Sequence, residues 1–236
     1  MDGFTTSRVV RPAAVPVLPR AAPCSGTGRD PRLREHHNGE MRTVFDPADL
    51  SPGRFYRLLT ATIVPRPIAW VSTVSADGIA NVAPYSFFTV ASTNPPVVQF
   101  TSVGRKDSLR NIEETGEFVV NVATTPLIEQ VNASSANFPH EVDEFAEVGL
   151  RAEPSERVRP PRVAESPASI ECTLRQVIEV GDCFVVMGDV VAVTVRSEVL
   201  ADDGAPDFAA LAPVSRLGRA EWGLTPPVRS LERPTG

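Results

Sequence analysis

Short runs of β-forming residues, separated by turn signals, fill the stretch 65–121 and constrain the fold more than any other feature. Prolines at the start of this stretch exclude a helix there and begin a strand. Asp77-Gly78 supplies the positive φ angles that a tight hairpin needs between the runs 68–74 and 79–84. Strands joined by hairpins, with few crossover helices, predict a mainly β protein built as an antiparallel barrel with short peripheral helices.

Helix signals interrupt this β pattern at two places. Asp107 or Ser108 is expected to cap a helix that runs through Glu114, and Gly116 is expected to end it. A second short helix is expected to begin at Thr125-Pro126, with proline in the first helical position. Two long alternating runs, 168–179 and 184–195, then predict a last pair of strands.

The composition excludes several classes of function. The 236 residues carry a net charge of -6 with an isoelectric point of about 5.2, so the chain has no broad basic face and no nucleic-acid partner is expected. No apolar run approaches the ~18 residues of a membrane span. Cys24, Cys172 and Cys183 are odd in number and lack metal or redox spacing, so we expect free thiols in a reducing compartment and a cytoplasmic protein.

The first forty residues differ from the rest. They hold six arginines and five prolines and show no sustained periodicity, which predicts a disordered leader or a start codon assigned too early, with the true start at Met41. An arginine-rich transit peptide is a further reading, although acidic residues and prolines in the segment oppose it. Residues 41–236 are expected to form a single domain with an irregular C-terminal tail.

The usual catalytic and metal motifs are missing from the sequence. HExxH, GxSxG, P-loop and GxGxxG patterns do not occur, so no metal site is predicted and the catalytic residues stay unassigned. His140 is the one histidine outside the first forty residues. It is expected either to reach a bound nicotinamide or simply to face solvent.

Two neighbouring segments form the candidate site. Small and aromatic residues alternate over 81–88, so a planar ligand can approach the backbone there and the amides of 85–87 can donate to it; the alternative is an ordinary strand edge. The turn at 102–108 holds Arg105 and the chain's single lysine, Lys106, at an expected helix start. Free amides and basic side chains at a helix N-terminus attract a phosphate. Drift at an exposed position, or capping of the helix by Asp107, are the alternatives.

Over roughly residues 44–225 the chain carries a series of motifs in a fixed order: PRPIAWVST, DG, NVAPYSFF, NPPVVQF, GRKDSLRNIEETGEFVVN, DEF and GL. In this series the chain resembles the flavin reductase-like family. The resemblance implies an FMN-binding split β-barrel, with FMN near a homodimer interface. It implies that the flavin ring lies against Asn81, Ala83, Pro84, Tyr85, Ser86 and Phe87, that the phosphate is held by Ser102, Arg105, Lys106 and Ser108, and that Arg66 is a further cofactor contact. The later SRLG…W segment more often ends in tyrosine in the family, so Trp222 receives no role.

The implied activity is transfer of hydride from NAD(P)H to flavin, with a partner oxygenase as a possible receiver of the reduced flavin. The sequence leaves two alternatives open. One is an FMN-binding electron carrier without nicotinamide activity, and the other is a flavin-binding protein that does not turn its flavin over.

Overall fold

The computed structural model describes residues 32–35 and 41–234, and the chain divides into two compact units after Pro52. In the first unit, β1 (Arg32–Glu35) pairs antiparallel with β2 (Met41–Val44), and the short helix η1 (Pro47–Asp49) follows. The prediction of disorder for residues 1–40 falls almost wholly outside the described residues and stays a prediction.

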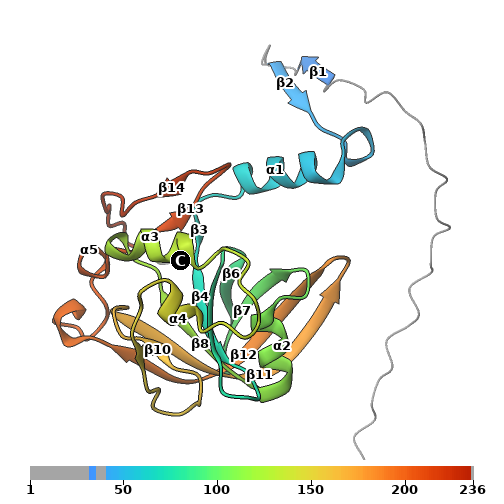
Figure 1. Ribbon diagram of the computed structural model, residues 1–236. Helices are drawn as coiled ribbons and strands as arrows, with labels where there is room; N and C mark the ends of the chain where they lie inside the picture. The colour runs from blue at the N-terminus through green and yellow to red at the C-terminus, as the bar shows by residue number, and fades with distance from the viewer. Residues whose placement is uncertain (1–31, 36–40, 235–236) are drawn as a thin grey trace, which may run out of the picture. The chain divides into compact units, whose positions relative to one another are not determined.

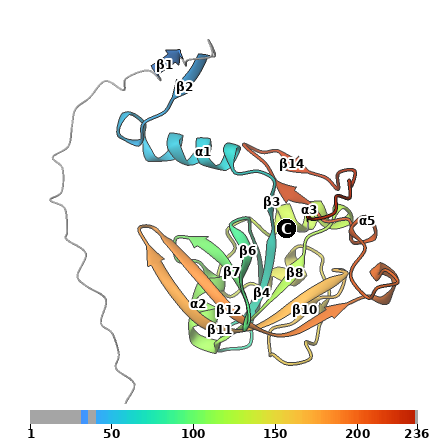
Figure 2. The same ribbon diagram turned by 180° about the vertical axis from the view of Figure 1, so that it is seen from behind.

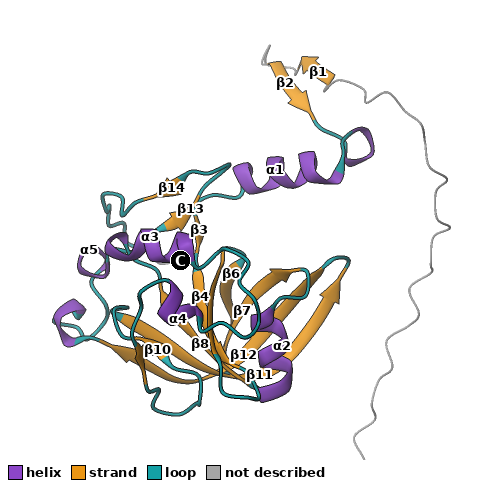
Figure 3. Cartoon of the chain, in the orientation of Figure 1, coloured by secondary structure: helices purple, strands orange, loops and turns teal. Residues whose placement is uncertain are grey.

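The second unit is mainly β, with short helices around the strands (Figure 3). Its strands are β3 (Arg66–Pro67), β4 (Ala69–Val74), β5 (Ala80–Tyr85), β6 (Phe88–Thr93), β7 (Pro96–Val103), β8 (Glu117–Val122), β9 (Ala152–Glu153), β10 (Arg162–Val163), β11 (Ala168–Val180), β12 (Cys183–Val195), β13 (Ser215–Arg216) and β14 (Trp222–Gly223). Its helices are α1 (Pro52–Thr62), α2 (Asp107–Thr115), η2 (Thr125–Leu127), α3 (Ile128–Ala133), α4 (Glu144–Glu147), η3 (Ser197–Val199) and α5 (Phe208–Leu211).

Seven antiparallel strands form one sheet in the order β5-β4-β8-β11-β12-β7-β6. The two edge strands of this order, β5 and β6, are consecutive in the chain and are joined by only Ser86 and Phe87. Three Cα–Cα steps separate Tyr85 from Phe88, so the two strand ends lie at most about 11 Å apart and the sheet must curl. The result is the split β-barrel of Figures 1 and 2. The strand order places its split between the edge strands β5 and β6.

The barrel interior is filled by one apolar cluster. Its aromatic centre is Phe100, which packs against Tyr85 at 4.7 Å and Phe118 at 5.7 Å between ring centroids. Helix α2 closes one end, because Leu109 and Ile112 lie on one face three residues apart and both are fully buried in this cluster. The start of α2 is thereby fixed against β4 and β5.

A second cluster covers the outer face of β4 and β5. Because side chains alternate along a strand, Ala69 and Val71 face the interior while Ile68 and Trp70 face outward. Helices η2, α3 and α4 lie over the outward residues and contribute Leu127, Val131 and Phe145. None of the described helices is long and apolar enough to cross a bilayer.

The expected hairpin and helices occur, with one correction. Gly78 has φ 89° in the turn before β5, and Gly116 ends α2 in the left-handed conformation. The prediction that Asp107 or Ser108 caps α2 is wrong: Lys106 is the N-cap residue, and no side chain caps the helix. Asp107 is instead the first helical residue, and its carboxylate pairs with Arg110 at 2.7 Å and with His140 at 3.3 Å.

Candidate functional site

The end of β5 and the start of α2 border three adjoining hollows. The Lys106 hollow, of about 300 Å³, is lined by Ala83, Pro84, Tyr85, Arg105, Lys106, Asp107, Ser108, Arg110, Ser134, Ser135, Ala136, Asn137 and Phe138. The Phe87 hollow, of about 180 Å³, is lined by Tyr56, Pro84, Tyr85, Ser86, Phe87, Thr101, Val103 and Lys106. The Trp222 hollow, of about 140 Å³, is lined by Ile68, Pro84, Ser86, Val131, Asn132, Ser135, Arg216 and Trp222.

Pro84 borders all three hollows, so they form one cleft around it. Tyr85 and Lys106 are shared by the Lys106 and Phe87 hollows, and Ser86 is shared by the Phe87 and Trp222 hollows. The cleft lies at the split of the barrel, because the split is where the chain leaves β5 for β6. Small-molecule sites are concave and need about 300 Å³ or more, which the joined hollows supply.

Lys106 carries a charge in this cleft that no neighbouring group of the described residues compensates. It is exposed, and the structure gives its ammonium no ion pair or hydrogen bond within the described part of the chain. The first amides of α2 point toward the same end of the cleft, since an uncapped helix N-terminus leaves its first N–H groups free. A free ammonium beside free amides is a suitable environment for an anion.

The other predicted phosphate contacts are placed differently from Lys106. The Arg105 guanidinium pairs with Glu113 at 2.6 Å and lies 4.9 Å from the Phe184 ring centroid, so its charge is already engaged. Glu113 raises the pKa of Arg105. Ser108 borders the Lys106 hollow, but its buried hydroxyl donates to Asn81 Oδ1 at 2.8 Å.

Tyr85 borders the cleft with its backbone while its ring is part of the barrel interior. Its hydroxyl is fully buried and makes no well-formed hydrogen bond among the described residues, although the hydroxyls of Ser108 and Ser102 lie near it. Burial raises the pKa of Tyr85 to about 12, so the hydroxyl keeps its proton near neutral pH. The hydroxyl belongs to the barrel interior, and Tyr85 is not counted among the donors of the cleft.

Arg66 does not line the cleft but contacts Ser86, which does. Its guanidinium donates to the carbonyl oxygens of Thr60, Ile63 and Leu217, and Nε donates to Ser86 Oγ at 3.4 Å. These bonds tie the end of α1 and the segment after β13 to the β5–β6 connection. Arg66 therefore orients Ser86, which is the residue that borders two hollows.

Asn81 and Ser102 also lie behind the cleft. Asn81 is buried, and its Oδ1 accepts from Ser108 Oγ and from Thr73 Oγ1, which joins β5 to the start of α2. Ser102 is fully buried, and its hydroxyl donates to the Gly104 carbonyl at 2.9 Å, which shapes the turn before Lys106. Both residues hold the two halves of the site together.

A buried carboxylate supports β5 from the outer side. Glu144 is 6% exposed, and its Oε2 accepts from the Val82 amide at 3.0 Å. This amide lies on the free edge of β5, where no neighbouring strand can pair with it. Burial, together with the nearby carboxylate of Asp107, raises the pKa of Glu144 to about 7.

Sequence reasoning missed a large part of the cleft wall. The segment 134–138 lines the Lys106 hollow, and Tyr56 lines the Phe87 hollow, where its ring lies 6.2 Å from that of Phe87. Arg216 and Trp222 complete the Trp222 hollow. The only signal for any of them was the SRLG…W segment, whose role the sequence left open.

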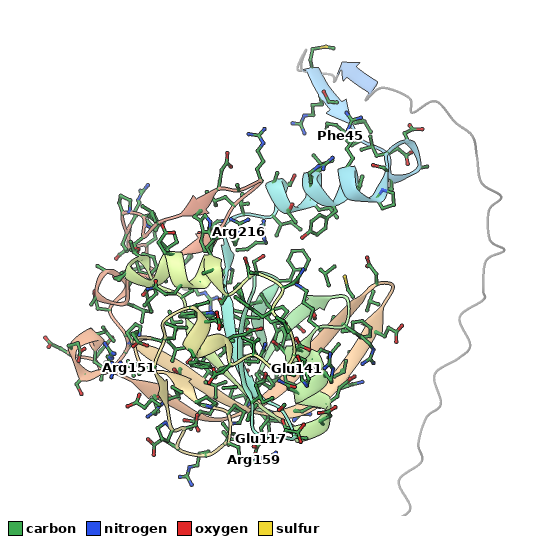
Figure 4. The ribbon with its side chains drawn as sticks, viewed as in Figure 1. Phe45, Glu117, Glu141, Arg151, Arg159 and Arg216 are labelled. Carbon is green, nitrogen blue, oxygen red and sulfur yellow. The ribbon has the colours of Figure 1, made fainter. Side chains whose placement is uncertain are left out.

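Two hollows elsewhere in the molecule are larger, at about 380 and 490 Å³. Their arginines are paired with carboxylates, and Figure 4 labels Arg151 among them. Arg151 pairs with Glu165 at 2.9 Å and Arg196 with Glu198 at 3.7 Å. The described residues contain no cluster of histidine, cysteine or acidic side chains fit for a metal ion. The cleft around Pro84 is therefore the better candidate for ligand chemistry.

Comparisons with known proteins agree on one family. The model of the flavin reductase like domain matches residues 61–208. An uncharacterised protein of Halalkalibacterium halodurans is 42% identical over 202 residues, which cover 80% of this chain and 96% of that protein.

Two solved structures of oxidoreductase systems have the same fold. Nitrilotriacetate monooxygenase component B from Bacillus cereus is 31% identical with a TM-score of 0.75, over 80% of this chain and 98% of that one. The 2-nitrobenzoate 2-nitroreductase from Pseudomonas fluorescens is 30% identical with a TM-score of 0.77, over 82% of this chain and 97% of that one.

Proposed function

The chain belongs to the flavin reductase-like family, and on that premise we propose that it binds FMN and passes hydride from NAD(P)H to flavin. The observation that carries the proposal is the uncompensated Lys106 at the uncapped N-terminus of α2. FMN differs from riboflavin by a phosphate, and this phosphate is the anion that a free ammonium and free helix amides favour.

The residues of the cleft fit FMN in their donors as well as in their charge. Lys106 and the first amides of α2 would hold the phosphate. The backbone of 84–87, with Ser86 oriented by Arg66, would lie along the flavin ring. When bound, FMN supplies the ring that accepts hydride and passes on electrons.

Protein residues in this scheme bind, orient and shield. The backbone and small side chains of 83–86 allow close approach of a flat ring, and Tyr56 and Phe87 supply apolar surface in the Phe87 hollow. Neither cysteine of the described residues borders the cleft, so no covalent anchor is expected from them: Cys172 is buried in the barrel interior and Cys183 lies at the start of β12. Free thiols at both positions support a cytoplasmic location.

We also propose that the protein is a homodimer. Ile178 and Val180 on β11 and Val103 on β7 are 40%, 59% and 42% exposed, and Val103 and Val180 both pair with Cys183 in the sheet. These three residues form an exposed apolar face, and Val103 also borders the Phe87 hollow. A second copy on this face would bury its apolar surface and border the flavin ring, which needs shielding from water.

The reduced flavin is proposed to serve a partner oxygenase, because the similar component B is by its name one component of a nitrilotriacetate monooxygenase. The alternative is an electron carrier that binds FMN without reacting with nicotinamide. Open, non-covalent contacts around Pro84 favour exchange of flavin and therefore the reductase.

Anaerobic mixing of the FMN-loaded protein with NADH or NADPH distinguishes the reductase from the electron carrier. The proposed reductase bleaches the visible flavin absorbance with at least one of the two donors, and added free FMN then accelerates nicotinamide oxidation. If neither donor bleaches the bound flavin, the reductase proposal fails and the carrier takes its place. A Ser86→Phe variant, which fills two hollows at once, is expected to lose the reaction while keeping its melting temperature.

A further inference from the structure

Apart from Pro84 and Ser86, the residues of the Trp222 hollow are not among the proposed FMN contacts. It shares Pro84 and Ser86 with the Phe87 hollow, so it opens beside the proposed position of the flavin ring. Its volume of about 140 Å³ equals the share of roughly five liquid waters, which is the space of one six-membered ring with a small substituent. Its walls are apolar at Ile68 and Val131 and polar at Asn132 and Ser135.

Arg216 provides a positive charge at this hollow. Its Cζ lies 4.8 Å from the centroid of the Trp222 ring, and its terminal nitrogens donate to the carbonyl oxygens of Glu221 at 3.3 Å and Arg219 at 3.1 Å. A guanidinium has five N–H donors, so most of them are still available. No carboxylate of the described residues lies within ion-pair distance of Arg216 (Figure 4 labels it).

A second guanidinium adds to the same potential. Arg66 lies opposite Arg216 in the β3–β13 pairing, and its partners are all neutral oxygens. Burial lowers the pKa of Arg66, and the charge of Arg216 lowers it further, so each arginine lies in the field of the other. None of the residues that line the Trp222 hollow is acidic. Two uncompensated cations beside a ring-sized space of mixed apolar and polar lining favour an anionic ring compound.

We infer that the Trp222 hollow is a subsite for a small aromatic carboxylate, with the ring between Ile68, Val131 and Trp222 and the carboxylate bound by Arg216. A planar guanidinium binds a carboxylate with two parallel hydrogen bonds. The subsite rests on the proposed function in one respect: it places the aromatic acid beside the flavin, as second reactant or competitor. A phosphate alone would use Arg216 but would leave the apolar walls unoccupied.

Tryptophan fluorescence of the flavin-free protein tests the subsite directly. The chain has two tryptophans; Trp70 is fully buried in the outer cluster, and Trp222 borders the hollow. Benzoate is expected to change the emission saturably, and Trp222→Phe is expected to abolish the change. Benzamide, which has nearly the same shape without the charge, is expected to bind at least about tenfold more weakly.

Two arginines of one hairpin provide variant and control. Arg216→Gln is expected to weaken benzoate binding by at least about tenfold and to leave benzamide unchanged, whereas Arg216→Lys, which keeps the charge, gives an intermediate loss. Arg219→Gln is the matched control, because Arg219 is 86% exposed, does not line the hollow and pairs only weakly with Glu221 at 3.7 Å. Equal melting temperatures of the variants show that the hairpin is intact.

Three results would overturn the subsite: equal affinity for benzoate and benzamide, an unchanged benzoate affinity in Arg216→Gln, or displacement of benzoate by equimolar inorganic phosphate. The last would show a plain anion site. FMN titrations of the same proteins keep this test separate from the proposed function. Failure of FMN to bind wild type would defeat the function and leave the benzoate result standing, while Arg216→Gln is expected to bind FMN as wild type does.

Discussion

Replacing Glu144 with glutamine tests how the buried carboxylate supports the strand that carries the cleft. Glu144 is 6% exposed under the free edge of β5, with the Val82 amide as its donor. Burial, and then the carboxylates of Asp107 and Asp143, raise its pKa from 4.5 to about 7, while the bonds from Val82 and Asn81 lower it. The folded protein therefore binds this proton more tightly than the unfolded chain does.

The magnitude follows from that shift. A pKa difference of about 2.5 units corresponds to about 3 kcal/mol, at about 1.4 kcal/mol for each unit. Because the folded state holds more protons, the contribution of Glu144 to stability is complete below pH 4.5 and is lost as the pH rises to about 7. Glutamine has nearly the same shape, accepts from Val82 and has no charge to desolvate, so its stability should not show this loss.

The assay is denaturant unfolding of wild type and Glu144→Gln across the interval from pH 4.5 to pH 7. The free energy of unfolding of the variant, minus that of wild type, should increase by about 3 kcal/mol across it. Other carboxylates titrate in both proteins and cancel in this difference. Glu147→Gln, at an exposed position of the same helix, is the control and should run parallel to wild type. If the free energy of unfolding changes with pH in the same way for Glu144→Gln and wild type, the pKa of Glu144 is not raised in the folded protein.

Three further results are expected. Tyr85→Phe removes a buried hydroxyl that makes no well-formed hydrogen bond, so it should stabilise the flavin-free protein by about 1 kcal/mol in thermal denaturation; a loss of stability would show that Ser108 or Ser102 pairs with it. Wild type should sediment near twice 25.4 kDa and Val180→Asp as a monomer, and a monomeric wild type would remove the dimer. Gly188→Ala adds a methyl group that meets the Phe118 ring and should cost about 1–3 kcal/mol on denaturant unfolding, whereas Gly53→Ala meets nothing and should not.

Local signals predicted the strands and hairpins because their causes are local. Gly78 and Gly116 both have the positive φ that their positions in the sequence indicate, and Leu109 and Ile112 bury the predicted face of α2. These features needed no knowledge of distant contacts.

Tertiary partners decided what the sequence could not. Asp107 has the side chain of a helix cap, but Arg110 and His140 bind its carboxylate, and the helix N-terminus stays free. Arg105 has the type and place of a phosphate ligand, but Glu113 engages it. The same holds for the walls of the cleft, because Trp222 and Ser86 line one hollow although more than a hundred residues separate them along the chain.

Calorimetric titration of the flavin-free protein with FMN and with riboflavin tests whether Lys106 and the start of α2 bind the phosphate of FMN. We expect wild type to bind FMN more tightly than riboflavin, by about 1.5–3 kcal/mol or roughly ten- to a hundredfold, because the phosphate gains a charge-assisted contact to Lys106. Lys106→Met should lose most of this difference and bind riboflavin as wild type does, while the control Arg219→Gln should bind both flavins unchanged. Equal affinity of wild type for FMN and riboflavin would show that Lys106 and the start of α2 do not bind the phosphate.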